Sequence, residues 1–380
     1  MMRLSRHPGD ALGEIGQQVK PEKDKKEVEY NNLLIDAIQN GDSGKVNSLI
    51  HNGADVNYKD KDGKTPAYIA AQNGSVPLLR VLKELGADLN IGDKDGRTPA
   101  HIAAYKGHFE VLDALAELGG DLDQGDKDGK TPAYIAAING HVGVLKALAL
   151  QGVDLNIGDK DGWTPAHIMA HRGHVKVLQV LAENGADVNR GNQYSGDTPA
   201  CLAAYKGHVD ALRLLKKKAD LNKANKKGET PAYIAAENGQ VEVLKVLKEL
   251  EADLDKGNDN GDTPAYTAAQ NGKVPLLRLL SDLGADLNKP NNDGDTPAFI
   301  VAKEGKDYAL RVLRVLKELR ASLNKANKKG GTPAHIAAQN GHVKVLEVLA
   351  DKGACLNQVT KAGATPAHIA AQNGHVKVLE

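Results

Sequence analysis

The chain has 380 residues, of which 41% are apolar, 26% charged and only 3% aromatic, and its 49 basic residues balance 49 acidic ones. With no net charge, a general electrostatic attraction to nucleic acid or to an anionic membrane is not expected. Two cysteines, Cys201 and Cys355, are too few for a disulfide framework and fit a reducing compartment. The N-terminus lacks the apolar core of a signal peptide, and no apolar stretch approaches the roughly 18 residues of a spanning helix, so we expect a soluble cytoplasmic protein.

The N-terminal part of the chain differs from the remainder. Residues 1–29 are predicted to be disordered, and residues 30–60 contain two short helical stretches, near Asn32–Gln39 and Gly44–Ile50. These stretches form a degenerate unit that lacks the Thr-Pro dipeptide found later in the chain. Such a unit is typical of the capping repeat at the end of a stack.

From residue 65 onward, the dipeptide Thr-Pro recurs with a nearly constant period. The intervals between its ten copies run from 32 to 36 residues, and six of the nine intervals are 33 residues. Self-similarity at such a period indicates a repeat architecture. The ten threonines are Thr65, Thr98, Thr131, Thr164, Thr198, Thr230, Thr263, Thr296, Thr332 and Thr365.

Each repeat contains the signals for two helices and a turn. Thr65 can cap a first helix with its hydroxyl, Pro66 suits the first helical turn, and Gly74 ends that helix. A second helix is predicted to end at Gly86, because apolar residues recur at helical spacing before it, at Val76, Leu79, Leu82 and Leu85. The Asp-Lys-Asp-Gly segment after it has the composition of a turn.

A single helical hairpin of this size cannot bury both of its apolar faces. The repeats before and after it must cover them, and paired alanines such as Ala70 and Ala71 allow close packing of the first helices. We therefore predict an all-α solenoid that forms one array over residues 30–380.

The amino-acid sequence of the repeat resembles that of the ankyrin repeat. The segment Asp95–His108 reads Asp-Gly-Arg-Thr-Pro-Ala-His-Ile-Ala-Ala-Tyr-Lys-Gly-His, and Gly86–Asn90 reads Gly-Ala-Asp-Leu-Asn. With the 33-residue period, the resemblance covers about 11 repeats. It implies that the turns project as short β-hairpin fingers and that partners bind on a concave face. That face would be made by the finger tips and by the two residues before the glycine that ends each first helix.

Two irregularities interrupt the period. The repeat at 296–331 has three additional residues, which we place in its second helix, Asp307–Leu319, and which either change the local curvature or form a harmless bulge. Lys218, Glu251 and Arg320 replace the glycine that ends most second helices. The last repeat, 361–380, is incomplete, which favours a fragment of a longer array over a frayed end.

The thirteen histidines do not indicate a metal site. Ten of them occupy two recurrent positions, and the resemblance implies that these hydrogen-bond within and between repeats. The best candidate for a metal is the set His167, His171 and His174, because His-x-x-x-His places two imidazoles on one helix face. Two of these three are dictated by the repeat, so the structural interpretation is favoured and no metal or cofactor is expected.

Catalytic signatures are likewise missing from the sequence. It contains neither a Gly-x-x-x-x-Gly-Lys phosphate loop nor a Gly-x-Ser-x-Gly nucleophile elbow. Cys201 stands at a partly buried repeat position, where packing is favoured over a nucleophilic role. We therefore expect a protein that is not an enzyme.

The residue immediately before each Thr is sorted by charge along the chain. It is basic first, then aromatic, then acidic, and neutral at the end. Either a recognition stripe or the duplication of neighbouring repeats explains this order, and we favour recognition. The stripe consists of Lys64, Arg97, Lys130, Trp163, Asp197, Glu229, Asp262 and Asp295.

A second row, just before the glycine of each first helix, carries aromatic and cationic residues at its centre. The candidates in this row are Tyr105, Lys106, His171, Arg172, Tyr205 and Lys206. Trp163, on the finger of the repeat that contributes His171 and Arg172, is predicted to anchor a partner, although it could instead pack against a neighbouring finger, and Tyr194 lies on the next finger.

These features predict a monomeric, non-catalytic scaffold that binds another protein on its concave face, and neither nucleic acid nor membrane. The alternative is the targeting array of a larger enzyme, or of a bacterial effector acting in host cytoplasm. A metal- or ligand-binding sensor centred on His167 and His171 is a third, less favoured hypothesis.

Overall fold

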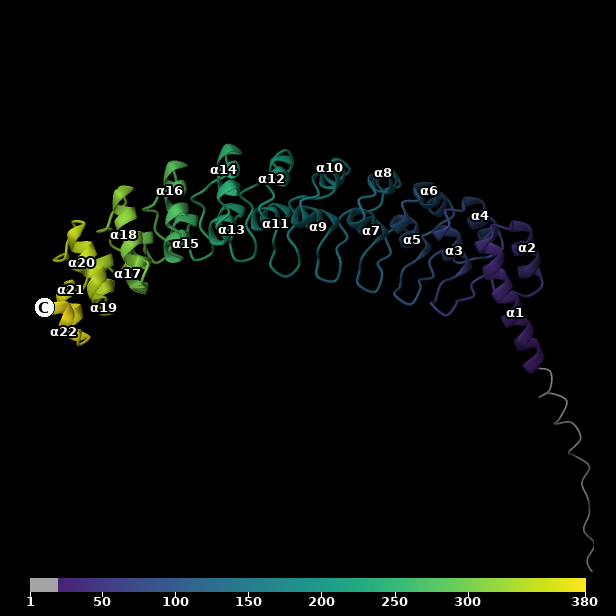
Figure 1. Cartoon of the computed structure of the whole chain (residues 1–380), viewed down its shortest axis with the longest axis horizontal. Helices are drawn as coiled ribbons and strands as arrows, with labels where there is room; N and C mark the ends of the chain where they lie inside the picture. The colour runs from purple at the N-terminus through teal and green to yellow at the C-terminus, as the bar shows by residue number, and fades with distance from the viewer. Residues whose placement is uncertain (1–19) are drawn as a thin grey trace, which may run out of the picture. The chain divides into compact units, whose positions relative to one another are not determined.

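The computed structural model describes residues 20–380, and helices are the regular secondary structure of that range (Figure 1). The chain divides between Lys160 and Asp161 into two compact units. Every helix between residues 20 and 380 is too short or too polar to cross a membrane.

The first unit contains four helical hairpins. Its odd-numbered first helices pack against one another in sequence, and each even-numbered helix packs against the helix that precedes it. The helices are α1 (Lys20–Gln39), α2 (Ser43–His51), α3 (Pro66–Gln72), α4 (Val76–Glu84), α5 (Pro99–Lys106), α6 (Phe109–Glu117), α7 (Pro132–Ile138) and α8 (Val142–Leu150).

The second unit repeats the same arrangement. Its helices are α9 (Pro165–Arg172), α10 (Val175–Glu183), α11 (Pro199–Lys206), α12 (Val209–Leu215), α13 (Pro231–Asn238), α14 (Val241–Glu249), α15 (Pro264–Gln270), α16 (Val274–Asp282), α17 (Pro297–Glu304), α18 (Ala309–Glu318), α19 (Pro333–Gln339), α20 (Val343–Asp351), α21 (Pro366–Gln372) and α22 (Val376–Leu379).

The Thr-Pro dipeptide begins each first helix as predicted. In α3, the hydroxyl of Thr65 accepts a hydrogen bond from the backbone N–H of Tyr68 at 3.2 Å. The α5 helix ends at Gly107, whose φ of 82° is left-handed. Ala70 and Ala71 are completely buried, so first helices stack closely with few large side chains.

Buried histidines connect successive repeats. The N–H of Thr98 donates to Nδ1 of His101 at 3.1 Å, so Nε2 carries the proton and donates it to the Lys130 carbonyl at 2.9 Å. At the other recurrent position, Nε2 of His108 lies 3.2 Å from the carbonyl oxygen of Gln72 in the preceding repeat. The predicted hydrogen bonding within and between repeats is confirmed for these histidines.

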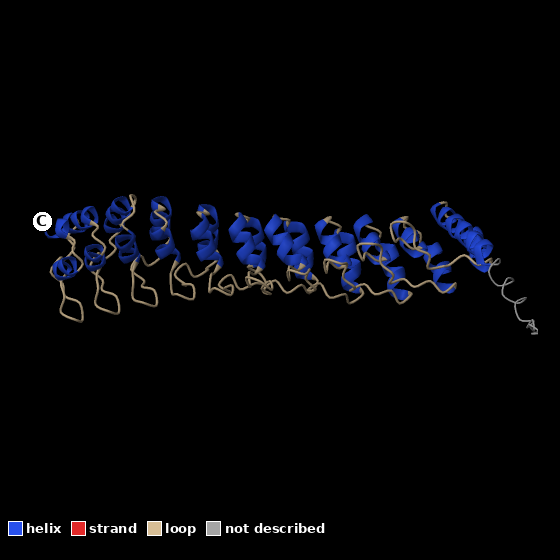
Figure 2. Ribbon diagram, turned by 90° about the horizontal axis from the view of Figure 1, so that it is seen from below, coloured by secondary structure: helices blue, strands red, loops and turns tan. Residues whose placement is uncertain are grey.

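The fingers, the loops that precede each Thr-Pro, are not β-hairpins. The expectation of short strands is wrong, because no strand occurs in residues 20–380 (Figure 2). Within one finger two backbone bonds close the loop: the Asp60 N–H donates to the Lys64 carbonyl at 3.0 Å, and the Gly63 N–H donates to the Asp60 carbonyl at 2.9 Å. The finger tip also bonds to the next finger, because the Asp62 carbonyl accepts a hydrogen bond from the Lys94 N–H at 3.1 Å. The fingers therefore pair with each other rather than forming ladders of their own.

The N-terminal prediction requires a correction. Of the segment predicted to be disordered, residues 1–19 lie outside the described residues, whereas residues 20–29 form the first half of α1. Lysine and glutamate, which dominate this stretch, are good helix formers, so charge alone does not indicate disorder.

The insertion in repeat 296–331 lies mostly outside the helix in which it was predicted. The loop between α17 and α18 takes two additional residues, and α18, with ten residues, is one longer than the nine-residue α16. Tyr308 reaches the position of the recurrent histidine, and its hydroxyl donates to the Gln270 carbonyl. The insertion thus preserves the bond between repeats.

Two of the three glycine replacements are strained. Glu251 and Arg320 each have a φ of 61°, and they are the non-glycine residues with positive φ in the described part of the chain. We expect Glu251→Gly and Arg320→Gly each to stabilise the protein by about 1 kcal/mol, because the left-handed conformation costs an L-residue roughly 1–2 kcal/mol. Chemical denaturation followed by circular dichroism measures this.

Lys218 supplies the matched control for that comparison, since it replaces the same glycine without adopting positive φ. Lys218→Gly is expected to leave stability unchanged or lower it. Equal stabilisation by all three substitutions would contradict the strain at Glu251 and Arg320.

Stability should also depend on pH through the buried histidines. Burial lowers the pKa of His167 to about 4 and also lowers that of His101. The unfolded chain therefore binds protons first as the pH falls below about 6.5, and folding weakens toward pH 4. His167→Tyr introduces the residue found at equivalent positions such as Tyr134. Between pH 7 and pH 5, this variant should lose about 1–2 kcal/mol less folding free energy than the original chain. Denaturation at the two pH values tests this, and identical pH dependence of both proteins would refute it.

Candidate functional site

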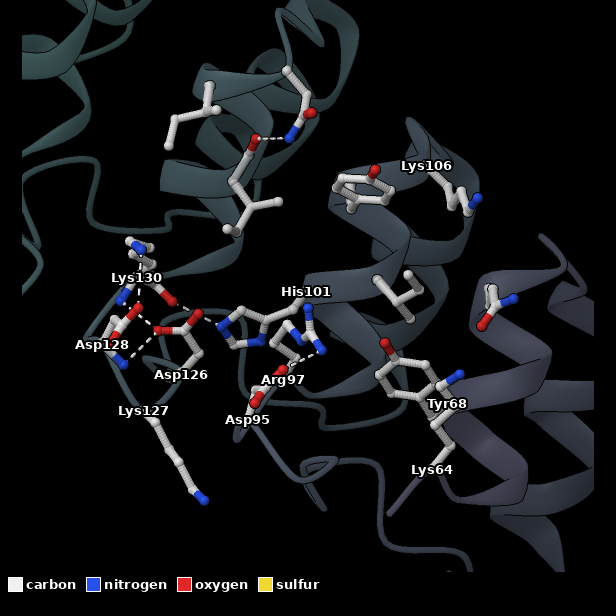
Figure 3. Close-up of a pocket in the computed structure, with 16 residues that line it drawn as sticks. Lys64, Tyr68, Asp95, Arg97, His101, Lys106, Asp126, Lys127, Asp128 and Lys130 are labelled. Atoms are coloured by element: carbon white, nitrogen blue, oxygen red, sulfur yellow. Dashed lines mark hydrogen bonds and ion pairs between the residues drawn. The ribbon is translucent and has the colours of Figure 1, made fainter. Parts of the chain in front are cut away.

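The first unit contains a groove of about 660 Å³ between its fingers and its first helices, which we call the first groove (Figure 3). Aromatic and aliphatic side chains form its floor, and charged side chains of the fingers form its margin. The floor includes Tyr68, Ile102, Tyr105, Ile135 and Ile138, and the charged residues are Lys64, Arg97, Lys106, Lys127, Lys130, Asp95, Asp126 and Asp128.

Five basic and three acidic side chains line the first groove, so its lining is net positive. The stripe cations are held by aspartates of their own fingers. Lys64 pairs with Asp62 at 3.5 Å and Lys130 with Asp128 at 3.0 Å. These ion pairs are exposed, so each contributes little stability and exchanges readily with other carboxylates.

Arg97 has two such partners. Its Nε lies 3.1 Å from a carboxylate oxygen of the buried Asp93, and it also pairs with Asp95. Although burial opposes its charge, these carboxylates raise the pKa of Arg97. The guanidinium is therefore oriented along the finger with 45% of its side chain still exposed.

The second unit contains a smaller groove of about 320 Å³, the second groove. It is lined by Trp163, His171, Ser195, Asp197, Cys201, Leu202, Tyr205, Asn225, Lys227, Glu229, Ile234, Glu237 and Asn238. Three acidic side chains and one basic side chain make its lining net negative, opposite to that of the first groove.

Trp163 is half-buried at the margin of the second groove. Its ring meets the edge of His171, with centroids 5.3 Å apart and planes at 76°, and lies 6.4 Å from His167. Burial lowers the pKa of His171, and the neighbouring cations Lys206 and Arg172 lower it further, so its ring is neutral near pH 7. Trp163 thus packs against two histidines of its own repeat and also borders the second groove. Its role as an anchor for a partner stays a prediction.

The acidic members of the stripe accept hydrogen bonds from asparagine side chains of the fingers. Nδ2 of Asn225 donates to Asp197 and to Glu229, both at 2.8 Å. In the same way, Asn291 donates to Asp262 at 2.9 Å, and Asn327 donates to the buried Asp295 at 2.8 Å. These bonds connect carboxylates to asparagines of the same or the following finger.

The charge order of the stripe parallels a change in the residue that closes each finger. The residue that closes each early finger is an aspartate, and in one of them, Asp93, the second carboxylate oxygen pairs with Arg97. Lys64 and Lys130 pair instead with Asp62 and Asp128 of their own fingers. In later fingers that residue is an asparagine, such as Asn291, whose oxygen accepts the same backbone N–H groups while its amide donates to an acid. The change from Asp to Asn therefore accompanies the change from basic to acidic.

The two grooves contain ten of the fifteen predicted site residues. Lys64, Arg97, Tyr105, Lys106 and Lys130 line the first groove, and Trp163, His171, Asp197, Tyr205 and Glu229 line the second. The remaining five, Arg172, Tyr194, Lys206, Asp262 and Asp295, line neither groove. Tyr194 is 71% exposed at a finger tip, and the Lys206 ammonium lies 4.8 Å from the centre of the Tyr205 ring.

Sequence reasoning missed the apolar residues of the two floors. Ile102, Ile135, Leu202 and Ile234 each stand four positions after a repeat threonine and border a groove. Their regular recurrence resembles that of core residues, so only the half-exposed state of Ile102 and Ile135 distinguishes them.

Cys201 and His167, in and beside the second groove, are buried. Burial raises the pKa of Cys201 to about 11, so its thiol stays protonated, in keeping with a packing role. His167 is bonded to Thr164 and to the Asp197 carbonyl. Among residues 20–380, no three histidine, cysteine or acidic side chains gather in a way that could hold a metal ion.

Stacked helical hairpins joined by projecting loops define a class of protein, the helical repeat solenoid. The family profile of ankyrin repeats in three copies matches residues 34–126, 118–192, 189–258, 248–326 and 311–380. The chain therefore belongs to the ankyrin-repeat family, whose repeats generally act as protein–protein interaction modules. A comparison with curated proteins finds no significant match.

The asparagine–acid bonds between fingers lead to a stability prediction. Asn327→Asp places a second carboxylate against Asp295, so we expect a loss of about 1–3 kcal/mol at pH 7. The exchanged pair, Asn327→Asp with Asp295→Asn, should recover most of that loss, since donor and acceptor are merely swapped. Denaturation of the two single variants and the double variant tests this coupling, and additive effects would show that the bond is unimportant.

Proposed function

We propose that the chain is a non-catalytic scaffold that binds a partner protein on the surface formed by fingers and first helices, with the first groove as a principal contact. The observation that carries this proposal is the floor of the first groove, where the exposed Tyr105 and the half-exposed Ile102, Ile135 and Ile138 lie beside oriented cations. Tyr105, which is 52% exposed, occupies a position that the repeat does not dictate.

The chemistry of the first groove favours a particular kind of partner segment. An apolar side chain would lie on Tyr105, Ile102 and Ile135, while carboxylates beside it would replace Asp62 or Asp128 as partners of the finger lysines. Aromatic and arginine side chains are the usual hot spots of such contacts. The expected partner segment is therefore acidic, with at least one apolar anchor.

The other predicted residues have different parts in this proposal. Tyr194, Arg172 and Lys206 are exposed in the second unit, where Arg172 and Lys206 lie beside His171 of the second groove and would add polar contacts to a partner there. Asp262 and Asp295 are already bonded to asparagines, so their contribution is smaller.

Selection of random twelve-residue peptides on the full chain tests the proposal without a known partner. Peptides rich in acidic and apolar residues are expected, and Tyr105→Ala with Arg97→Ala should weaken their binding about tenfold or more. Phe109→Ala with Arg80→Ala is the matched control, since both residues are exposed on second helices. Equal losses for both pairs, or selection of basic peptides that ignore Tyr105, would refute the first groove as the contact.

The same peptides should associate faster at low ionic strength. Complementary charges act mainly on the association rate, and salt screens them over about 10 Å at 0.1 M. Stopped-flow association at two salt concentrations measures this dependence. A rate that does not change with salt would exclude Lys64, Arg97 and Lys130 from the mechanism.

A further inference from the structure

The second groove differs chemically from the first, although the two are built from equivalent repeat positions. Its finger side carries Asp197 and Glu229, and its helix side carries Glu237 from α13. Trp163 and Tyr205 add two aromatic rings to the lining. Acidic and aromatic side chains together form a site suited to a cation.

The acidic groups can accept further hydrogen bonds. Asp197 and Glu229 each accept one bond from the Asn225 amide, and Asp197 also accepts one from the Ser195 hydroxyl. A carboxylate has acceptor sites for several donors, so both can accept more. Glu237 is exposed, and among the ion pairs of residues 20–380 none involves its carboxylate. The nearby Lys273 donates instead to the Glu237 backbone carbonyl.

The aromatic groups are held in place. The edge contact with His171 orients the Trp163 ring, and the neutral imidazole adds no positive charge to that wall. The ammonium of Lys206 lies 4.8 Å from the centre of the Tyr205 ring, so this ring already has a cation of the chain beside it, and Trp163 is the aromatic wall left for a partner. Lys227 is the one basic residue in the lining, and it lies on the finger side of the groove with Asp197 and Glu229.

We propose that the second groove takes a lysine or arginine side chain of a partner polypeptide, with Glu237 and Glu229 as its acidic contacts and Trp163 as its aromatic wall. This inference rests on the proposed use of the finger-and-first-helix surface for protein binding. It adds that the two units select segments of opposite charge: acidic in the first groove and basic in the second.

A labelled peptide tests this assignment directly. The probe is a fluorescein-labelled Gly-Ser peptide with a central Arg-Lys pair, titrated with the full chain at low ionic strength and followed by fluorescence anisotropy. Glu237→Lys should weaken its binding about fivefold or more, because it reverses one charge in the groove. Trp163→Leu should weaken it about threefold or more, because the aromatic wall is removed.

Glu347→Lys is the matched control, since it makes the same change of charge at an exposed position of α20 that lines neither groove. Binding by this variant should stay within about twofold of the original chain. Equal weakening by Glu237→Lys and Glu347→Lys would show a general charge effect and overturn the proposal. Failure of the Arg-Lys peptide to bind the unmodified chain would overturn it as well.

The two proposals fail in distinguishable ways. Tyr105→Ala with Arg97→Ala should leave binding of the Arg-Lys peptide unchanged, because these residues belong to the first groove. If selected acidic peptides depend on Tyr105 but the Arg-Lys peptide ignores Glu237, the scaffold function stands and the cation pocket is wrong. If the Arg-Lys peptide depends on Glu237 and Tyr105 has no effect on any peptide, the second groove stands and the first does not.

Discussion

The backbone bond from each finger tip to the next finger is the interaction on which both grooves depend. Lys127 N–H donates to the Asp95 carbonyl at 2.9 Å in the first unit, and Asp259 N–H donates to the Lys227 carbonyl at 3.0 Å in the second. Because these bonds use only backbone groups, they fix the spacing of the fingers without constraining the side chains at their tips. A constant frame can therefore carry a lining of either charge.

The chemistry inside a finger then restricts the side chain that precedes the threonine. An aspartate that closes a finger can pair with a cation at that position, as Asp93 does with Arg97, and an asparagine can donate to an acid there, as Asn225 does to Glu229. The charge of each groove is thus partly a consequence of local hydrogen bonding. Selection for a partner can act on the remaining positions, among them Tyr105, Trp163 and Glu237.

Much of this structure could be predicted from sequence because each repeat carries residue signals that mark where its helices begin and end. Thr-Pro marks the first helix of every repeat after the N-terminal one, and the resemblance to ankyrin repeats implied the hydrogen bonding of the recurrent histidines. The form of the fingers could not be predicted in this way, since their bonds join residues one full repeat apart, such as Asp62 and Lys94. The groove floors were missed for a related reason: Ile102 and a core isoleucine look alike in sequence, and only the packing separates them.

Hydrogen–deuterium exchange of the full chain with a selected acidic peptide tests most directly whether fingers and first helices form the binding surface. Added protection is expected in the backbone of the fingers at 91–97 and 124–130 and at the ends of α5 and α7, which border the first groove. Protection confined to the second helices α4, α6 and α8 would contradict the proposal, because it would place the partner on the opposite layer of the unit.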